Sequence, residues 1–170
     1  RQKPPVNIGD CADIQPAHRL VGQDDLWPKL QHPPQNQLLH IAARKLAEFT
    51  PRYIDLFTAL AVRFNVNIIG GSQFTVEDDA LFNVAYLFRR DGSVATQKKL
   101  HITPAEAKWW GVQGGNELEA FETDRGRIGI LICYDVEFPE AVRRLAHENV
   151  GLVFVPYNTN DKLGHYRVRA

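Results

Sequence analysis

Cys133 is the residue of this sequence whose type and surroundings most clearly suggest chemistry. It ends an apolar run in GILICYDVEFPE, residues 129–140, and the polar residues Tyr134 and Asp135 follow it directly. A turn from a strand into a helix is a place for a nucleophile, because it presents a side chain near helix N–H groups. Free cysteine is also among the most often buried residue types, so core packing is the alternative interpretation.

A thiol that acts as a nucleophile needs help to ionise. An ordinary thiol is only about 3% ionised at pH 7, and reaching one half requires about 2 kcal/mol of stabilisation. The sequence offers a cation in QKKLH, residues 97–101, where Lys99 ends a predicted strand and His101 follows two residues later. Lys98 and Lys99 alone would be interpreted as a solvated strand end, so the lysine matters only together with Cys133.

The elements that must position these residues begin with helices. Residues 1–39 contain six of the ten prolines, and we expect them to be irregular, disordered or out of register with the fold. Residues 40–49 predict a short helix, and Thr50 with Pro51 predicts the start of a second one. The apolar face of this second helix should lie against a sheet and consists of Tyr53, Leu56, Phe57, Leu60, Ala61 and Phe64.

Apolar runs in the middle of the chain predict strands. Residues 66–74 predict a short buried strand that is closed by Gly70 and Gly71. Residues 82–88 and 93–100 predict the two strands of a hairpin, joined by a turn at residues 90–92. The segment that follows, residues 102–115, predicts a long loop with one helical turn.

The last third of the chain continues the alternation of strands and helices. A strand near Phe121 and a turn at residues 124–126 precede an apolar strand over residues 127–133. Residues 138–148 predict a helix that turns Ala141, Val142 and Leu145 inward, and residues 151–156 predict another strand. Strands without a polar face, alternating with helices, predict an α/β layered fold with a covered sheet.

Composition narrows the classes of function. The chain has 170 residues with 44% hydrophobic content, enough for one domain with a core. Twenty basic residues balance twenty acidic ones without a basic cluster, so a nucleic-acid or membrane partner is not expected. Two cysteines give no disulfide framework, and no apolar segment is long enough to cross a bilayer, so a cytoplasmic location is predicted.

The motifs together resemble the nitrilase superfamily of carbon–nitrogen hydrolases. They are K-K-L-H at residues 98–101, Glu106 in the next loop, and C-Y-D at residues 133–135. The resemblance covers residues 40–170, and it implies an α/β fold, the nitrilase-like αββα sandwich, which we expect to be incomplete at both ends. It further implies an enzyme that needs no metal and no cofactor.

The resemblance implies a role for each matching residue. Cys133 corresponds to the nucleophile, Lys99 to the triad lysine, and Glu106 to a second glutamate that orients this lysine. The backbone N–H of Tyr134 and the Lys99 ammonium would stabilise the charge that develops on the substrate. The C-Y-D turn is similar to that of amidases and carbamoylases. We therefore expect hydrolysis of a small amide or N-carbamoyl compound through a cysteine thioester.

Substrate contacts are expected just after the last predicted strand. Residues 157–161, YNTND, predict a binding loop with Asn158 and Thr159 as contacts, although an ordinary polar turn fits them equally. The expected partners are a small-molecule substrate and further copies of the chain, because members of the family commonly form oligomers.

One part of the sequence departs from the family pattern. The triad glutamate should fall between Arg19 and Gln37, where the only acidic residues are Asp24 and Asp25. The segment is out of register, the chain is truncated, or the general base has been lost. The last case predicts a catalytically impaired remnant that acts in binding or assembly. A redox thiol protein is the weakest alternative, since Cys11 is the only other cysteine.

Overall fold

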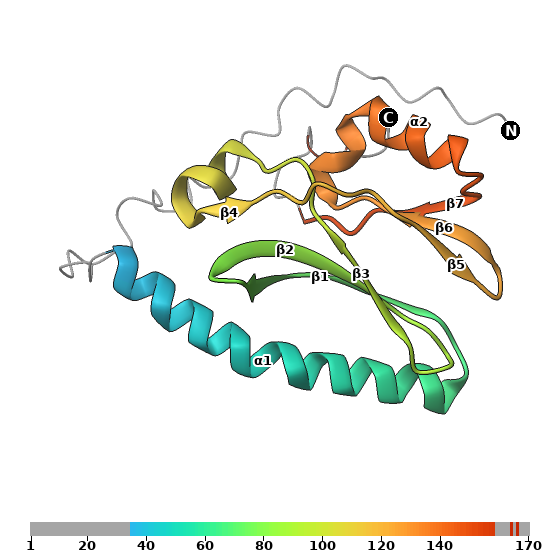
Figure 1. Ribbon diagram of the computed structural model, residues 1–170, viewed down its shortest axis with the longest axis horizontal. Coiled ribbons are helices and arrows are strands. Elements are labelled where there is room, and N and C mark those ends of the chain that lie inside the picture. The colour runs from blue at the N-terminus through green and yellow to red at the C-terminus, as the bar shows by residue number, and fades with distance from the viewer. Residues whose placement is uncertain (1–34, 159–163, 165, 167–170) are drawn as a thin grey trace, which may run out of the picture. The chain divides into compact units, whose positions relative to one another are not determined.

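The computed structural model describes residues 35–158, 164 and 166, and the residues from Asn36 onward belong to one compact unit. Two sheets lie between two helices in this unit (Figure 1). Helix α1, Gln35–Phe64, covers one sheet and helix α2, Pro139–His147, covers the other. The predicted α/β sandwich is confirmed. The domain boundary at residue 40 stays a prediction, because nearly all of residues 1–39 lie outside the described part.

The sheet next to α1, called sheet A, is built on a meander. Its strands β1, Ile68–Glu77, β2, Ala80–Phe88, and β3, Val94–Lys98, pair antiparallel in the order β1-β2-β3. The short strand β4, Val112–Gln113, runs parallel to the start of β2, beyond the point where β3 ends. The predicted hairpin of β2 and β3 is therefore confirmed.

The sheet next to α2, called sheet B, has three strands. Strand β5, Ala120–Thr123, pairs antiparallel with β6, Gly126–Ile130, and β6 pairs parallel with β7, Leu152–Phe154. Helix α2 is the crossover between β6 and β7, which places it on the face of sheet B away from sheet A.

Alternation along β2 and β6 builds the three layers of the core. Val84, Tyr86 and Phe88 pack with α1, whereas Ala85 and Leu87 pack with sheet B. The next layer joins the two sheets and consists of Ala85, Leu87, Phe121, Ile128, Ile130 and Ile132. Between sheet B and α2, Leu131 packs with Ala141 and Leu145. A β carbon on Gly129 would lie 2.6 Å from the end of the Leu145 side chain, so any larger residue here would have to displace Leu145, and glycine lets α2 approach closely.

The two helices predicted before residue 65 form a single helix, so that prediction was wrong. Helix α1 runs through Pro51, which is exposed, and the carbonyl group left without its usual partner can therefore be hydrated. The helix packs on sheet A through Tyr53, Ile54, Phe57 and Ala61. Leu56 and Phe64 were predicted inward but are 56% and 61% exposed; Leu56 lies to one side of the buried row and Phe64 ends the helix.

Strand β1 does not stop at its two glycines, as the sequence predicted, and most of it is only half-buried. The pairing with β2 shifts between Ile69 and Ser72, and Gly71 has a φ of +82° there. A bulge accommodates the glycines within the strand instead of ending it. The Tyr53 hydroxyl donates a hydrogen bond to the Gly70 carbonyl at 2.8 Å, so α1 contacts sheet A at this irregular position.

The last third of the chain follows the prediction with small differences. Strand β6 ends at Ile130 rather than at Cys133, and β7 is shorter than predicted. Ala141 and Leu145 of α2 are buried as predicted, but Val142 is 38% exposed because it lies about 100° around the helix from Ala141. The predicted helical turn in the long loop is η2, Glu106–Trp110.

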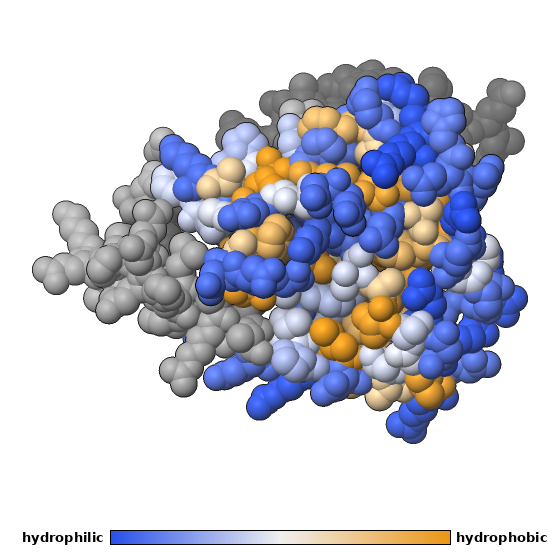
Figure 2. All heavy atoms as spheres, viewed as in Figure 1, coloured by the Kyte–Doolittle hydropathy of each residue, from blue (hydrophilic) through white to orange (hydrophobic). Residues whose placement is uncertain are grey.

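Two properties of the described part of the chain bear on membrane association, the hydropathy of its surface and the length and apolar character of its helices. Hydrophilic residues predominate on the face shown in Figure 2, with hydrophobic patches between them. Neither described helix combines the length and apolar character needed to span a bilayer.

Candidate active site

Cys133 lies at a backbone turn immediately after sheet B. It opens the short helix η3, Cys133–Glu137, with a φ of +52°, a left-handed conformation that is uncommon for any residue other than glycine. Its N–H donates to the Pro156 carbonyl at 2.9 Å, as Leu131 N–H does to Phe154 at 3.0 Å. The pairing of β6 with the chain after β7 therefore continues up to Cys133. Such strained conformations persist only where surrounding contacts hold them, and they gather at functional sites.

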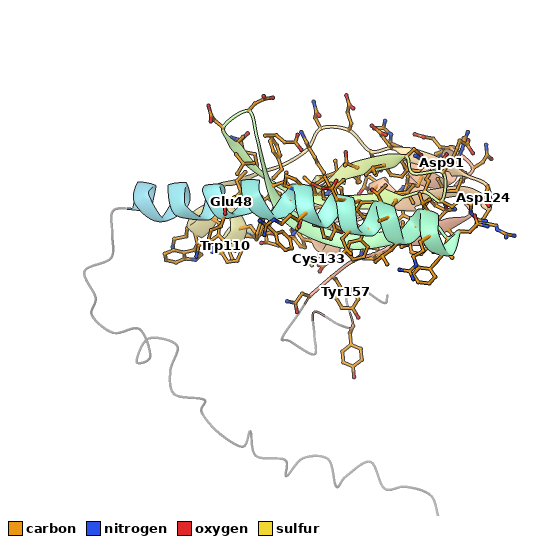
Figure 3. All side chains as sticks on the ribbon, turned by 90° about the horizontal axis from the view of Figure 1, so that it is seen from below. Glu48, Asp91, Trp110, Asp124, Cys133 and Tyr157 are labelled. Carbon is orange, nitrogen blue, oxygen red and sulfur yellow. The ribbon has the colours of Figure 1, made fainter. Side chains whose placement is uncertain are left out.

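The thiol is partly exposed. Cys133 contacts the inter-sheet core from its edge rather than filling its centre. Figure 3 shows it near the middle of the structure, with Tyr157 close to it. Cys133 is thus partly buried and packs against the inter-sheet core, without being enclosed by it.

Lys99 follows β3 directly and is nearly inaccessible, with 2% of its side chain exposed. Its N–H donates to the Asn83 carbonyl at 2.8 Å, which extends the pairing of β3 with β2 by one residue. The ammonium Nζ lies 2.9 Å from Oε1 and 2.7 Å from Oε2 of Glu106. A buried cation is tolerated only with such a partner, because desolvation of an unpaired ion costs several kcal/mol.

Glu106 is held from two sides. Its Oε2 also accepts hydrogen bonds from the Thr103 N–H at 2.9 Å and the Thr103 hydroxyl at 2.7 Å. Burial acts to raise the pKa of Glu106, but the hydrogen bonds from Lys99 and Thr103 outweigh it, and the pKa lies below the ordinary value. The carboxylate thus stays charged and is a weak proton acceptor, which suits orientation of Lys99 better than general-base catalysis.

Asp135 joins the segment after Lys99 to the turn that carries Cys133. This side chain is completely buried, and it accepts hydrogen bonds from the backbone N–H groups of Leu100, His101 and Ile132. In the sequence, Asp135 is visible only as a polar residue after the cysteine and as the last residue of the C-Y-D motif. An acid directly after an apolar run was the available signal, because buried carboxylates are almost always hydrogen-bonded.

The remaining predicted site residues lie near these elements or outside the described part. Tyr134 follows Cys133 within η3 and is half-buried. Asn158 is exposed and stands two residues after Pro156, the partner of Cys133. Thr159 lies outside the described residues. No group of three metal-binding side chains was found in the described part of the chain.

A large cavity of about 990 Å³ lies away from Cys133. Residues at the start of β1, β6 and β7 line it, whereas Lys99 and Cys133 follow the ends of β3 and β6. The cavity is therefore at the opposite end of the strands from the cysteine turn. We place the candidate site at Cys133, because the buried polar groups gather there.

The comparisons with known proteins identify the class of this chain. Residues 31–169 match the carbon–nitrogen hydrolase family, and the chain belongs to that family. The probable hydrolase YhcX of Bacillus subtilis is 52% identical over 129 residues, which make up 76% of this chain and 25% of that protein. The chain spans between 25% and 52% of the length of the first curated relatives that it matches.

Solved structures support the same fold. The yeast protein Nit3 of Saccharomyces cerevisiae, from branch 10 of the nitrilase superfamily, has a TM-score of 0.62 at 24% identity, over 67% of this chain and 42% of that one. A variant amidase from Nesterenkonia sp. AN1, solved after addition of acrylamide to its active-site cysteine, has a TM-score of 0.58 at 25% identity. That match covers 72% of this chain and 47% of the amidase.

Proposed function

We propose that this chain contributes the nucleophile and the oxyanion-stabilising groups of a hydrolase that cleaves small amides or N-carbamoyl compounds. The observation that carries the proposal is the left-handed backbone of Cys133 at the end of sheet B. A strained, partly exposed cysteine at this place is expected for a nucleophile, and core packing alone does not require a left-handed backbone. Similarity to an amidase that has an active-site cysteine supports an amide-like substrate.

The reaction begins when the Cys133 thiolate attacks the carbonyl carbon of the substrate. The negative charge that develops on the oxygen is stabilised by the Tyr134 N–H and the Lys99 ammonium. A lysine ammonium has three N–H donors, and Glu106 takes two of them, which leaves one for the substrate. A carboxylate base, which the family pattern puts upstream of residue 40, takes the thiol proton and passes it to the nitrogen as the C–N bond breaks, so the amine departs protonated.

The second half of the reaction removes the acyl group from Cys133. A water molecule attacks the thioester carbon, its proton returns to the sulfur, and the carboxylic or carbamic acid leaves. In this scheme Glu106 orients Lys99 throughout, because its lowered pKa makes it a poor base. Asn158 and Thr159 are proposed as substrate contacts, and a homo-oligomeric state and a cytoplasmic location remain predictions.

A catalytically impaired protein is the second candidate function. Residues 19–37 contain no glutamate, although a general base of the family pattern is expected there. Loss of a general base costs about 10²- to 10⁴-fold in rate. This candidate predicts that Cys133 still accepts an acyl group but releases it too slowly for useful turnover, so that the fold serves binding or assembly.

One experiment separates the two candidates. Ammonia release from aliphatic amides and N-carbamoyl amino acids is measured together with the mass of the intact chain, for the wild type, Cys133→Ala and the control Cys11→Ala. Steady release that disappears only in Cys133→Ala supports the hydrolase. A stable acyl adduct on Cys133, with one equivalent of ammonia or amine released and no further turnover, supports the impaired protein. Equal release by wild type and Cys133→Ala contradicts both.

A further inference from the structure

We propose that Asp135 is a positioning residue that fixes the Cys133 turn relative to the Lys99 segment. The inference rests on the proposed thioester chemistry, in which these two side chains act on one substrate. They come from different layers, since β3 belongs to sheet A and β6 to sheet B. Small movements of one sheet against the other would therefore separate them unless a direct link exists.

The Asp135 carboxylate supplies this link through backbone groups on both sides. Its Oδ1 accepts from His101 N–H at 2.7 Å and from Leu100 N–H at 3.1 Å, both just after Lys99. Its Oδ2 accepts from Ile132 N–H at 3.1 Å, the residue before Cys133, and lies 3.2 Å from Leu100 N. Only 1% of the side chain is exposed, so solvent hardly competes for these bonds.

A second pair of contacts joins the same two segments. The His101 ring places Nδ1 at 3.1 Å from Asp135 Oδ1, and it stacks on the Phe138 ring with centroids 3.6 Å apart and an interplanar angle of 8°. Because the carboxylate oxygen is an acceptor, Nδ1 is the nitrogen that carries hydrogen. Histidine from the Lys99 segment thus contacts both an acid and an aromatic ring from the residues after Cys133.

The chemistry of these contacts allows only a carboxylate at this position. The three backbone partners are N–H donors, and they reach both oxygens of Asp135. An asparagine of the same shape would turn its NH₂ group toward at least one of these donors and lose that bond. Asp135→Asn therefore weakens the link with little change in volume. Misplacement of reacting groups by about 1 Å can cost about 10²-fold in rate.

The test compares Asp135→Asn with Asp91→Asn in the full chain. Asp91 also accepts a backbone N–H, from Ser93 at 2.8 Å, but it lies at the far end of the structure from Cys133 (Figure 3). The rate of Cys133 alkylation by iodoacetamide is measured on folded protein, and it needs no turnover. We expect a rate about 10-fold or more lower in Asp135→Asn and an unchanged rate in Asp91→Asn, with kcat on an amide about 10²-fold lower and KM within about 3-fold.

A second variant keeps the inference testable if Asp135→Asn does not fold. His101→Phe retains the stack on Phe138 and removes the ring hydrogen bond to Asp135. Slower alkylation of Cys133 in this folded variant supports the positioning role. If every folded variant alkylates at the wild-type rate and only thermal stability falls, Asp135 is structural and the inference is overturned. Because alkylation is independent of hydrolysis, absence of amidase activity would contradict the proposed function alone.

Discussion

The two ends of the strands in this sandwich differ in what they bury. At one end the completely buried Asp135 and the nearly buried Lys99 have hydrogen-bonding partners at 2.7–3.2 Å. At the other end a cavity of about 990 Å³ is lined by apolar side chains such as Leu87 and Phe154, with Arg90 and Arg125 among its residues. From this difference we infer the proposed site from buried, hydrogen-bonded charges rather than from the volume of a cavity.

The physical reason is the cost of burying charge. Moving an ion from water into the protein interior costs several kcal/mol unless well-placed partners compensate for the lost hydration. Replacement of a buried ion pair by apolar residues of similar size often leaves the protein equally stable. We therefore expect that the buried charges of Asp135 and Lys99 have a functional role in addition to any contribution to stability. The charged residues at the cavity end form exposed pairs, such as Arg90 with Asp124 at 3.3 Å, and pairs of this kind contribute little.

Removal of the buried ammonium should have the largest effect. Lys99→Met keeps a long side chain but removes a donor to the oxyanion, so kcat on an amide should fall about 10²- to 10³-fold. Lys98→Met is the matched control, because Lys98 is 36% exposed and pairs with Glu77. Steady-state kinetics on folded protein checks the prediction. Similar losses in both variants would show that Lys99 has no special role.

A substitution at the cavity end should affect stability and leave chemistry intact. Leu87 is fully buried between the sheets and lines the cavity, so Leu87→Ala should lower the free energy of unfolding by about 3 kcal/mol. The control Val94→Ala, at a 37% exposed position of the same end, should change it by less than about 0.5 kcal/mol. Urea unfolding measures both. We expect kcat per folded molecule to change less than about 2-fold, and a larger drop would mean that the ends are coupled.

Loss of the Glu106 charge should have a smaller effect than loss of Lys99. Glu106→Gln keeps the side-chain length but leaves Lys99 without its charged partner, and we expect kcat to fall about 10-fold. Glu77→Gln serves as the control, since Glu77 pairs with Lys98 and is 40% exposed. The ratio of kcat values for the two variants is the measurement. Equal kcat values in Glu106→Gln and Glu77→Gln would show that Glu106 does not orient Lys99.

The smallest expected effect is on the pH dependence of the melting temperature, when Glu106 is replaced by glutamine. The pKa of Glu106 lies below the ordinary 4.5, so an unfolded chain takes up the proton first as the pH falls. Its stabilising contribution is complete above the ordinary value and is lost as the pH falls through the folded one. Melting temperatures between about pH 5 and pH 3 should therefore fall less steeply in Glu106→Gln than in wild type.

The exposed carboxylate Asp91 provides the comparison at the other end. A hydrogen bond from Ser93 lowers the pKa of Asp91, but this side chain is fully exposed to solvent. Asp91→Asn should change the acid slope of the melting temperature less than Glu106→Gln does, because water screens its contacts. A larger change in Asp91→Asn would contradict the difference between the ends.

Local pattern was sufficient for much of the fold. The hairpin of β2 and β3 follows from an apolar run and a second strand-like segment on the two sides of a turn at Asp91 and Gly92, and α2 follows from Pro139 and the spacing of Ala141 and Leu145. The long helix was missed because Thr50 followed by Pro51 normally marks the start of a new helix. In this chain the tertiary packing keeps the helix continuous through both residues. The bulge at Gly71 was missed because a glycine pair in a strand indicates an end and a bulge equally.

Some residues of the candidate site could be predicted from local sequence, and others could not. Cys133 at the end of an apolar run and Lys99 at the end of a polar strand were visible in sequence, since both depend on neighbouring residues. Glu106 was paired with Lys99 only through a family resemblance. Asp135 was not assigned any role, because its partners at residues 100 and 101 lie about 35 positions away in the chain.

The sequence by itself determined the layered α/β class, the cysteine turn and the family, because periodicity, turn residues and short motifs are local properties. Tertiary structure alone decided which polar groups meet. Lys99 and Glu106 meet because the segment after β3 folds back over seven residues. The binding of Asp135 to both segments depends on how sheets A and B pack, through hydrophobic side chains far apart in the chain. Burial then made these few hydrogen bonds strong, because water no longer competes for them.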